Sequence, residues 1–278
     1  MLPLHADALT TEELSEWEDV GFIRLGHVAP ESEIAGLKDR IDEIMLGETT
    51  YDDMLMQLCP SSGMELAGEQ SKSFKGATLK YRKIQDLEMD PLFLEYIQKP
   101  LFRDITNKII ANAVSVYRAM FFNKPAGEGV TINWHQDGAG GWNLSIPPKV
   151  TIWTALDRTT LANGCLQLVA GTHREIIPET GDLLSDEQIA IHAPDSKRQY
   201  IEMEAGEVVL LHNWALHRSE TNSTDGPRRG FSVCYIDAET TERSSGRGFP
   251  QVFPDYIPVA SKAATQSQNL QTPKIARW

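Results

Sequence analysis

The feature that most constrains the fold is a series of short runs rich in β-branched and aromatic residues, each bounded by Gly, Pro or Asn. Runs of this length and composition are typical of β-strands, and many of them in succession are typical of a sandwich or a barrel. The predicted strands cover residues 114–122, 130–135, 149–156, 164–170, 207–211, 214–219 and 229–236. We therefore expect a mainly β fold in this part of the chain.

The start of the chain carries helix signals instead. Thr10 and Glu13 have the spacing of a capping box, and Gly21 follows after the next apolar residues. This pattern predicts a short helix over residues 11–20 that ends at the glycine, followed by a strand over residues 22–25.

Two longer helices should follow. An apolar stripe with charges on the other face predicts an amphipathic helix over residues 31–46. Asp90 and Pro91 are typical of a helix start and predict another helix, with a kink at Pro100. Residues 48–80 have no sustained period, so we expect a long loop there that lines a substrate pocket.

The chain of 278 residues is interpreted as one domain. Residues 1–112 should form a helical N-terminal support, residues 113–237 the β core, and residues 238–278 a C-terminal extension. Gly181–Gln199 is a polar insertion between two predicted strands, for which a lid and a solvated loop are both open interpretations.

Charge and cysteine usage exclude several functions. A formal net charge of −13 disfavours nucleic acid and anionic membranes as partners, because both are negatively charged. Cys59, Cys165 and Cys234 are odd in number and widely spaced, which predicts buried thiols rather than disulfides or a zinc site. Without a signal peptide or an apolar stretch of membrane-spanning length, we expect a cytoplasmic monomer or homodimer that acts on a small molecule.

A metal site is indicated by His135-Gln136-Asp137 at the end of one predicted strand. Residues two apart in an extended segment point the same way, so the imidazole and the carboxylate can converge on one ion. A second histidine would complete a set of two histidines and one carboxylate, which leaves coordination positions open for iron and oxygen chemistry. Periodicity alone leaves His212 and His217 equally suited to this role.

Arg228 favours His217. It follows that histidine by eleven residues, on the next predicted strand, so a hairpin can bring its guanidinium beside the metal. A guanidinium can bind a carboxylate through two parallel hydrogen bonds, and Ser219 can add a third.

Together these residues resemble a known family. His135-x-Asp137, the stretch from Val150 to His173, and His217-x-Ser219 followed by Pro-Arg-Arg at 227–229 look like the phytanoyl-CoA dioxygenase family, over roughly residues 114–237. The resemblance implies a double-stranded β-helix, which is a jelly-roll, cupin-like barrel of two facing sheets. It is carried by several motifs at once, whereas His-x-Asp alone would be weak.

The resemblance also implies the roles of individual residues. His135, Asp137 and His217 would bind Fe(II), and Arg228 and Ser219 would hold the far carboxylate of the cosubstrate 2-oxoglutarate. Two further residues, Trp153 and Lys80, are expected to contact the same cosubstrate. Position 230 is glycine where the family usually has a small apolar residue such as alanine. Related halogenases lack the carboxylate that Asp137 supplies here, which favours hydroxylation or another oxidation.

The predicted function is that of an Fe(II)- and 2-oxoglutarate-dependent dioxygenase. With O2 as the second cosubstrate, it would hydroxylate an unactivated C–H bond of a small metabolite and release succinate and CO2. Desaturation, epimerisation and ring formation at the same iron centre remain open, as does a non-catalytic protein that binds a metal or a 2-oxo acid. The candidate substrate contacts are Trp142, Arg118, Tyr81, Arg82 and Phe122.

Other polar residues have plainer interpretations. If His217 is the metal ligand, we expect His212 to lie in the core or to contact a metal ligand without binding the metal itself. His173 and Arg174 should close a turn, His192 should be solvated, and Arg229 should lie at the surface because it points away from Arg228 on the same strand.

Overall fold

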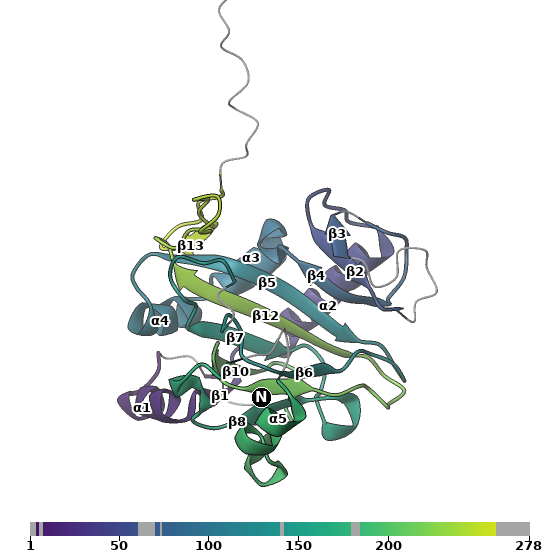
Figure 1. Ribbon diagram of the computed structural model, residues 1–278. Helices are drawn as coiled ribbons and strands as arrows, with labels where there is room; N and C mark the ends of the chain where they lie inside the picture. The colour runs from purple at the N-terminus through teal and green to yellow at the C-terminus, as the bar shows by residue number, and fades with distance from the viewer. Residues whose placement is uncertain are drawn as a thin grey trace, which may run out of the picture.

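Short strands that alternate between two facing antiparallel sheets build the centre of the protein (Figure 1). The computed structural model describes residues 4–5, 8–60, 70–72, 74–139, 142–178 and 184–259. The eight central strands are β5 (Val114–Lys124), β6 (Ile132–His135), β7 (Val150–Ala155), β8 (Leu166–Val169), β9 (Arg198–Ile201), β10 (Glu207–His212), β11 (His217–Ser219) and β12 (Arg228–Asp237).

The strand order identifies the architecture. One sheet contains the run β10-β7-β12-β5, and the other has the order β6-β11-β8-β9. Eight antiparallel strands in two facing sheets with these crossovers form a jelly roll. The predicted fold class, mainly β with N-terminal helices, is therefore confirmed.

Five further strands widen the larger sheet. They are β1 (Phe22–His27), β2 (Leu55–Leu58), β3 (Gln70–Lys72), β4 (Tyr81–Gln85) and β13 (Gln251–Phe253), of which only β1 was expected, and β9 of the smaller sheet was also missed. The prediction of a long loop over residues 48–80 is wrong, because β2 and β3 lie there; residues 61–69 and 73 are outside the described part of the chain. Short strands at a sheet edge owe their conformation to pairing with neighbours, which local sequence does not reveal.

The predicted helices form, with one correction. They are α1 (Thr11–Val20), α2 (Glu31–Leu46), α3 (Pro91–Ile97) and α4 (Pro100–Ile109). The Thr10–Glu13 capping box is present, and Gly21 ends α1 with a φ of 88°. The prediction of a single kinked helix from Pro91 is wrong, because α3 ends before Gln98 and Pro100 is the first residue of a separate helix, α4. The residue before a proline avoids helical dihedral angles, and Lys99 has a ψ of 137°.

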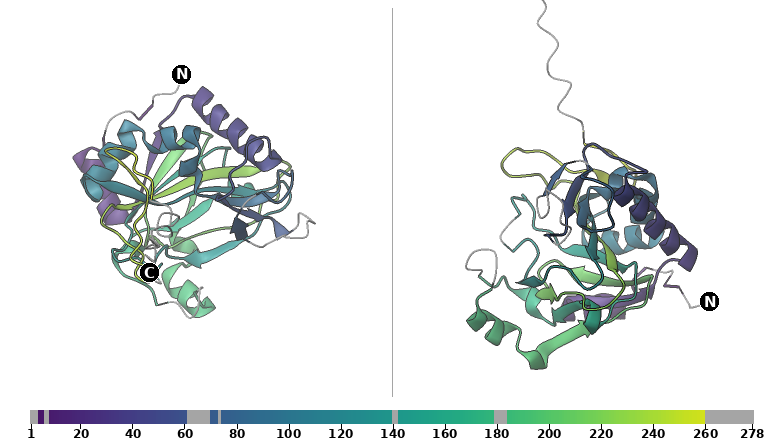
Figure 2. Two further views of the ribbon diagram at one scale, coloured as in Figure 1. Left: turned by 90° about the horizontal axis from the view of Figure 1, so that it is seen from above. Right: turned by 90° about the vertical axis from the view of Figure 1, so that its right-hand side faces the viewer.

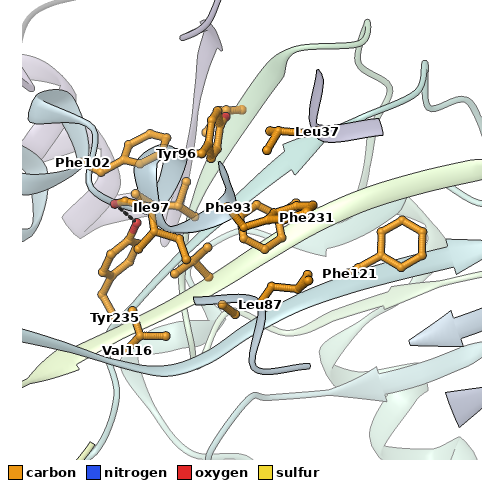
Figure 3. Close-up of a cluster of buried hydrophobic side chains, with 14 of the residues drawn as sticks. Leu37, Leu87, Phe93, Tyr96, Ile97, Phe102, Val116, Phe121, Phe231 and Tyr235 are labelled. Carbon is orange, nitrogen blue, oxygen red and sulfur yellow. Dashed lines mark hydrogen bonds between the residues drawn. The ribbon is translucent and has the colours of Figure 1, made fainter. Parts of the chain in front are cut away.

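Helices α2, α3 and α4 cover the outer face of the larger sheet. In Figure 2 the purple and blue helices lie on one side of this sheet, and the green helix α5 (Asp186–His192) lies on the opposite side of the molecule. Figure 3 shows the core between α3 and the sheet, where Phe93 meets Phe231 of β12 edge-on with ring centroids 4.9 Å apart. The buried Tyr235 hydroxyl donates a hydrogen bond to the carbonyl of Ile97 over 2.8 Å. The three cysteines are buried free thiols, as predicted.

The insertion before β9 is a packed element in its described part. Ser185 caps α5 through a capping box, and Ile189 packs against a cluster on the smaller sheet that contains Trp134 and Leu216. The described residues 184–199 do not line the cavity between the sheets. No helix in the described part of the chain combines the length and apolar character that a membrane-spanning segment requires.

Arg229 anchors the helical layer to the jelly roll. Its guanidinium pairs with Asp157, which follows β7, at 2.7 Å and with Asp42 of α2 at 3.0 Å. Arg229 does point away from Arg228, as predicted, but the expectation of a surface residue was wrong. Its half-buried ion pairs fix α2 against the ends of two strands.

The buried carboxyl of Glu88 makes stability depend on pH. Burial and the neighbouring Asp86 raise the pKa of Glu88 to about 8, against 4.5 for the ordinary side chain. Because the pKa of Glu88 is higher in the folded state, the protonated carboxyl favours folding. This contribution to the free energy of unfolding is fully present below pH 4.5 and is lost as pH rises toward 8. We predict that the free energy of unfolding of Glu88→Gln rises relative to that of the wild type by up to about 1.4 kcal/mol per pH unit across this window, because glutamine does not ionise. Urea denaturation at several pH values measures the difference, and parallel stability curves would contradict it.

Candidate metal centre

Antiparallel pairing of β6 and β11 brings two distant histidines together. His135 on β6 lies directly opposite His217 on β11, and their ring centroids are 4.1 Å apart. Asp137 follows β6, and its backbone N–H donates to the carbonyl of Asn213 over 2.8 Å. The structure thus brings the three predicted residues together, although they are separated by about eighty positions in the chain.

Gln136 fixes the turn that carries Asp137. Its buried side chain points the opposite way, and its amide Nε2 lies within hydrogen-bond distance, 2.7–3.0 Å, of three carbonyl oxygens, those of Thr172, Glu175 and Trp214. Its carbonyl oxygen accepts from the N–H of Ile177 at 2.8 Å. The sequence analysis assigns Gln136 no role. Its position between two candidate metal ligands is the feature that could have indicated one.

The ligand atoms of the three residues lie within 4.8 Å of one another. Nε2 of His135 is 3.6 Å from one carboxylate oxygen of Asp137, and Nε2 of His217 is 4.0 Å from the other. Each imidazole donates its Nδ1–H to a backbone carbonyl two residues earlier, those of Asn133 and Ala215, at 2.8 Å. This leaves both Nε2 lone pairs directed at one point, the arrangement of histidines that hold a metal.

The protonation states also suit a divalent metal. Burial and the neighbouring His135 lower the pKa of His217 to about 4, so its imidazole is neutral at pH 7. Burial would raise the pKa of Asp137, but the neighbouring His135, His217 and Arg118 outweigh this effect and lower the pKa. A carboxylate and a neutral imidazole are the forms that bind metals.

Arg228 lies in the same cavity as the three residues. It is 2% exposed, and its guanidinium lies 5.6 Å from the Trp153 ring centroid and donates to the carbonyl of Gly164. Burial lowers its pKa to about 10, which leaves it charged at pH 7. Its Nε has no hydrogen-bond partner, and no carboxylate of the described residues lies within ion-pair distance. Since buried charges require a partner, this side chain is suited to an anionic ligand.

The cavity between the two sheets has a volume of about 300 Å³. The candidate metal residues, Arg228, Ser219 and Trp153 all line it. Its apolar wall is formed by Met120, Phe122, Val130, Ile132, Leu166 and Leu211. Ligand sites are commonly apolar cavities with a few converging polar groups, and this one has that character.

Of the proposed substrate contacts, Arg82, Arg118 and Phe122 line this cavity. Arg118 lies 4.4 Å from the ring centroid of Trp142, which borders a second, outer cavity instead. Tyr81 was wrongly expected in the cavity wall: it is fully buried, and its hydroxyl bonds to the backbone of Lys75 and Gly76.

The other expectations concern five residues that lie outside the cavity. Lys80 does not line it, and its ammonium pairs instead with Glu128 at 2.9 Å, so nothing in its position favours a cosubstrate contact. His212 packs between Trp17 and His173 and borders a different pocket. His173, Arg174 and His192 also lie outside the cavity; the first two bond to the end of α1.

Two lysines that line the cavity, Lys83 and Lys124, were missed. Lys124 shares its face of β5 with Arg118, Met120 and Phe122, so strict alternation along this strand would have found it. Lys83 follows Arg82 directly, and alternation would place only one of the two in the cavity. The reason is a bulge in β4 that sequence does not signal.

Comparison with known proteins gives the family. Residues 17–230 match phytanoyl-CoA dioxygenase (PhyH) over most of the chain. The chain belongs to the phytanoyl-CoA dioxygenase family. A probable phytanoyl-CoA dioxygenase of Caenorhabditis elegans is 26% identical over 273 residues, which cover 93% of this chain and 86% of the relative. The peroxisomal phytanoyl-CoA dioxygenase of Homo sapiens is 23% identical, with 85% of this chain and 71% of the relative covered.

Family membership confirms the prediction of an enzyme of the iron- and 2-oxoglutarate-dependent oxygenase class. Solved structures support the fold. EctD from S. alaskensis with bound Fe has a TM-score of 0.69 at 20% identity and covers 87% of this chain and 80% of its own. The carbocyclase SnoK from nogalamycin biosynthesis has a TM-score of 0.65 at 20% identity, with 87% and 90% covered.

Gly230, where this chain departs from the usual family pattern, lies directly against the indole ring of Trp153. A Cβ atom at position 230 would lie well under 3.0 Å from the indole ring, so any larger residue must displace it. We predict that Gly230→Ala destabilises the fold by ~1–3 kcal/mol through overpacking. Adding Trp153→Phe should recover part of the loss, because the smaller ring leaves room. Urea denaturation of both single variants and the double variant measures this coupling, and purely additive effects would contradict the explanation.

Proposed function

We propose that this member of the phytanoyl-CoA dioxygenase family binds Fe(II) through His135, Asp137 and His217 and hydroxylates an unactivated C–H bond of a small metabolite. The observation that carries the proposal is the shared cavity. The Nε2 atoms of two histidines and a carboxylate converge there beside a buried guanidinium that has no carboxylate partner among the described residues.

The triad suits iron because of its donor set. Two neutral imidazoles and one carboxylate leave three of six coordination positions to exogenous ligands, and Asp137 reduces the net charge of the centre to about +1. The backbone hydrogen bonds at both Nδ1 atoms hold the rings in place before a metal arrives, so binding requires little reorganisation.

Arg228 and Ser219 would hold the remote carboxylate of 2-oxoglutarate. A buried guanidinium can form two charge-assisted hydrogen bonds to a carboxylate, and the buried hydroxyl of Ser219 lines the same cavity. Trp153 packs along Arg228 and restricts its rotation. Among relatives in structure, EctD from S. alaskensis has been solved with 2-oxoglutarate and 5-hydroxyectoine.

When bound, iron and 2-oxoglutarate together would activate O2, with release of succinate and CO2 and oxidation of the substrate. The protein contributes position and exclusion of water. The apolar side chains of Met120, Phe122 and Leu211 form the wall facing the substrate and decide which C–H bond lies nearest the metal.

Desaturation, epimerisation and ring formation are the alternative outcomes at such a centre. The structural neighbours include a carbocyclase and an epimerase, SnoK and SnoN, on the same fold. Product mass separates hydroxylation, which adds one oxygen atom, from epimerisation, which leaves the mass unchanged, and from desaturation and ring formation, which each remove two hydrogen atoms. The NMR spectrum of the product then distinguishes a double bond from a new ring. The cytoplasmic location and the monomeric or homodimeric state stay predictions of the sequence.

The decisive experiment is anaerobic loading with Fe(II) and 2-oxoglutarate, followed by admission of oxygen and assay for succinate. An active oxygenase releases succinate, and a screen of metabolites then finds those that accelerate the release. Iron and 2-oxoglutarate binding without any succinate would instead favour a non-catalytic binding protein.

The choice between the two candidate histidines is testable directly. We predict that His217→Ala lowers Fe(II) affinity by at least about a hundredfold, because it removes a ligand. His212→Ala, the matched histidine variant, should retain Fe(II) affinity. Metal content after equilibrium dialysis measures both, and loss of iron in the His212 variant alone would refute the assignment.

Arg228→Gln tests the cosubstrate site. We expect the 2-oxoglutarate dissociation constant to rise roughly thirtyfold or more, equivalent to about 2 kcal/mol or more, since a buried carboxylate loses its charged partner. Fe(II) affinity should change little. Arg158→Gln removes an exposed arginine that pairs with Glu204 and serves as the control. Unchanged 2-oxoglutarate affinity in the Arg228 variant would remove this residue from the site.

A further inference from the structure

The outer cavity, which has no part in the proposed function, lies beside the metal cavity. Its volume is about 570 Å³, and strands β2 to β5 and the segment after β12 contribute to its wall. Arg118 of β5 lines both cavities, so the two are neighbours with this side chain at their border. A molecule in the metal cavity can therefore extend past Arg118 into the outer one.

Glu88, in the 3₁₀ turn Leu87–Met89 after β4, is the feature of this cavity that points to a ligand. Its side chain lines the wall but is only 8% exposed. One carboxyl oxygen, Oε2, has no hydrogen-bond partner among the described residues. Buried carboxyls are normally hydrogen-bonded or paired with a cation, so this group suits a partner from outside the chain.

The carboxyl of Glu88 also lowers stability at neutral pH. Burial and the neighbouring Asp86 raise the pKa of Glu88 to about 8, so its ionisation opposes folding. Glutamine would fill the same space without this cost, as the prediction for Glu88→Gln states. An acid kept where it destabilises the fold is typical of a functional position.

Asp86 adds a second carboxyl to the same wall. Burial raises its pKa by more than a hydrogen bond and the surrounding cations lower it. The nearest basic side chains have other partners: Lys72 pairs with Asp53 at 2.6 Å, and Arg118 donates to the Tyr117 hydroxyl at 2.9 Å. Two neighbouring acids therefore face the cavity without a paired cation in the described part of the chain.

Aromatic rings line the cavity next to these acids. They belong to Tyr117, Trp142, Phe249 and Tyr256, and the Phe249 ring meets that of Tyr117 edge-on at 5.4 Å. The guanidinium of Arg118 already lies 4.6 Å from the Tyr117 ring centroid and 4.4 Å from that of Trp142, so this wall accepts a cation. Carboxyls beside aromatic rings suit an organic ammonium ion, whereas a hydrated divalent ion requires six or more oxygen ligands.

We propose that the outer cavity binds an organic ammonium group, with Glu88 and Asp86 as its anionic partners. The metabolite oxidised at the metal is then an amine whose charged end lies here, past Arg118. The first statement rests on the outer cavity alone, and the second also rests on the proposed function.

The first test compares an amine with the matched alcohol. Protein loaded with Zn(II) and 2-oxoglutarate, which does not turn over, is titrated at about pH 8.5 with hexylammonium and with hexan-1-ol, using ligand-observed NMR. We expect hexylammonium to bind at least about tenfold more tightly. Glu88→Gln should lose this preference and Asp86→Asn should weaken it. Glu204→Gln, which removes an exposed acid paired with Arg158, should retain it.

Proton release gives an independent readout, because a cation beside Glu88 favours its ionised form. At pH 7 the carboxyl is mostly protonated, so binding of hexylammonium should release up to about one proton. Calorimetry in two buffers of different ionisation enthalpy measures this release, which Glu88→Gln should abolish. The titratable groups next to Glu88 are Asp86 and Tyr256, and the other charged groups of the cavity wall are Asp53, Lys72, Arg118, Glu242 and Arg247.

Melting temperature separates binding from a structural role. At pH 7, Glu88→Gln should melt at the same temperature as the wild type or higher. A large fall would show that the carboxyl supports the fold and would overturn the inference. Equal binding of amine and alcohol would also overturn it, as would an amine preference or a proton release that survives Glu88→Gln.

Paramagnetic relaxation tests whether the amine is the substrate. With Mn(II) in place of Zn(II) under anaerobic conditions, the methyl end of bound hexylammonium should relax faster than the CH2 group beside the nitrogen, because the charged end lies away from the metal. The reverse gradient, or no enhancement, would overturn the substrate assignment alone. If the protein binds neither metal nor 2-oxoglutarate, the proposed function fails, and the amine preference of the metal-free wild type against Glu88→Gln still decides the outer cavity.

Discussion

The site depends on the pairing of β6 with β11. These two short strands place His135 opposite His217, with the centroids of the two imidazole rings 4.1 Å apart. A slip of one residue in this register would turn one imidazole to the outer face of the smaller sheet. The carbonyls that accept from both Nδ1 atoms belong to the same strands or the turns before them, so the register also fixes how the rings point. Strand pairing is therefore the main constraint on the metal centre.

Side chains alternate between the two faces of a strand, so neighbouring residues of one strand can serve the cavity and the helical layer. On β12, Arg228 faces the cavity, whereas the next residue, Arg229, faces outward and pairs with Asp157 and Asp42. Adjacent guanidiniums thus serve the site and the helical layer separately. The same alternation puts Phe231 of β12 into the core under α3 (Figure 3). Because helices brace the outer face, the inner face is held rigid around the ligands.

The features that could be predicted from the sequence are those that depend on interactions between residues close together in the chain. The capping box of α1, the apolar stripe of α2 and seven of the central strands are local patterns, and they were found in nearly the right places. The set of His135, Asp137, His217 and Arg228 could be predicted because the spacing of eleven residues from His217 to Arg228 fits a hairpin of two neighbouring strands. Strands β2, β3 and β4 depend on pairing with one another, so the sequence predicts a loop where β2 and β3 lie and no element where β4 lies. Tyr81 and Lys80 were misplaced for the same reason, since only the bulge beside them decides which side chains enter the cavity.

The unequal distribution of charge links the fold to its chemistry. Burying a cation without an anionic partner is unfavourable, and the folded chain accepts this at Arg228 in the cavity wall. The opposite arrangement holds at Arg229, which lies outside the cavity and has two carboxylate partners, Asp157 and Asp42. A structural role would favour partners for every buried charge, as at Arg229. At Arg228 a buried guanidinium faces the cavity without a carboxylate partner among the described residues, which suits an anion from outside the chain and a site organised before that anion arrives.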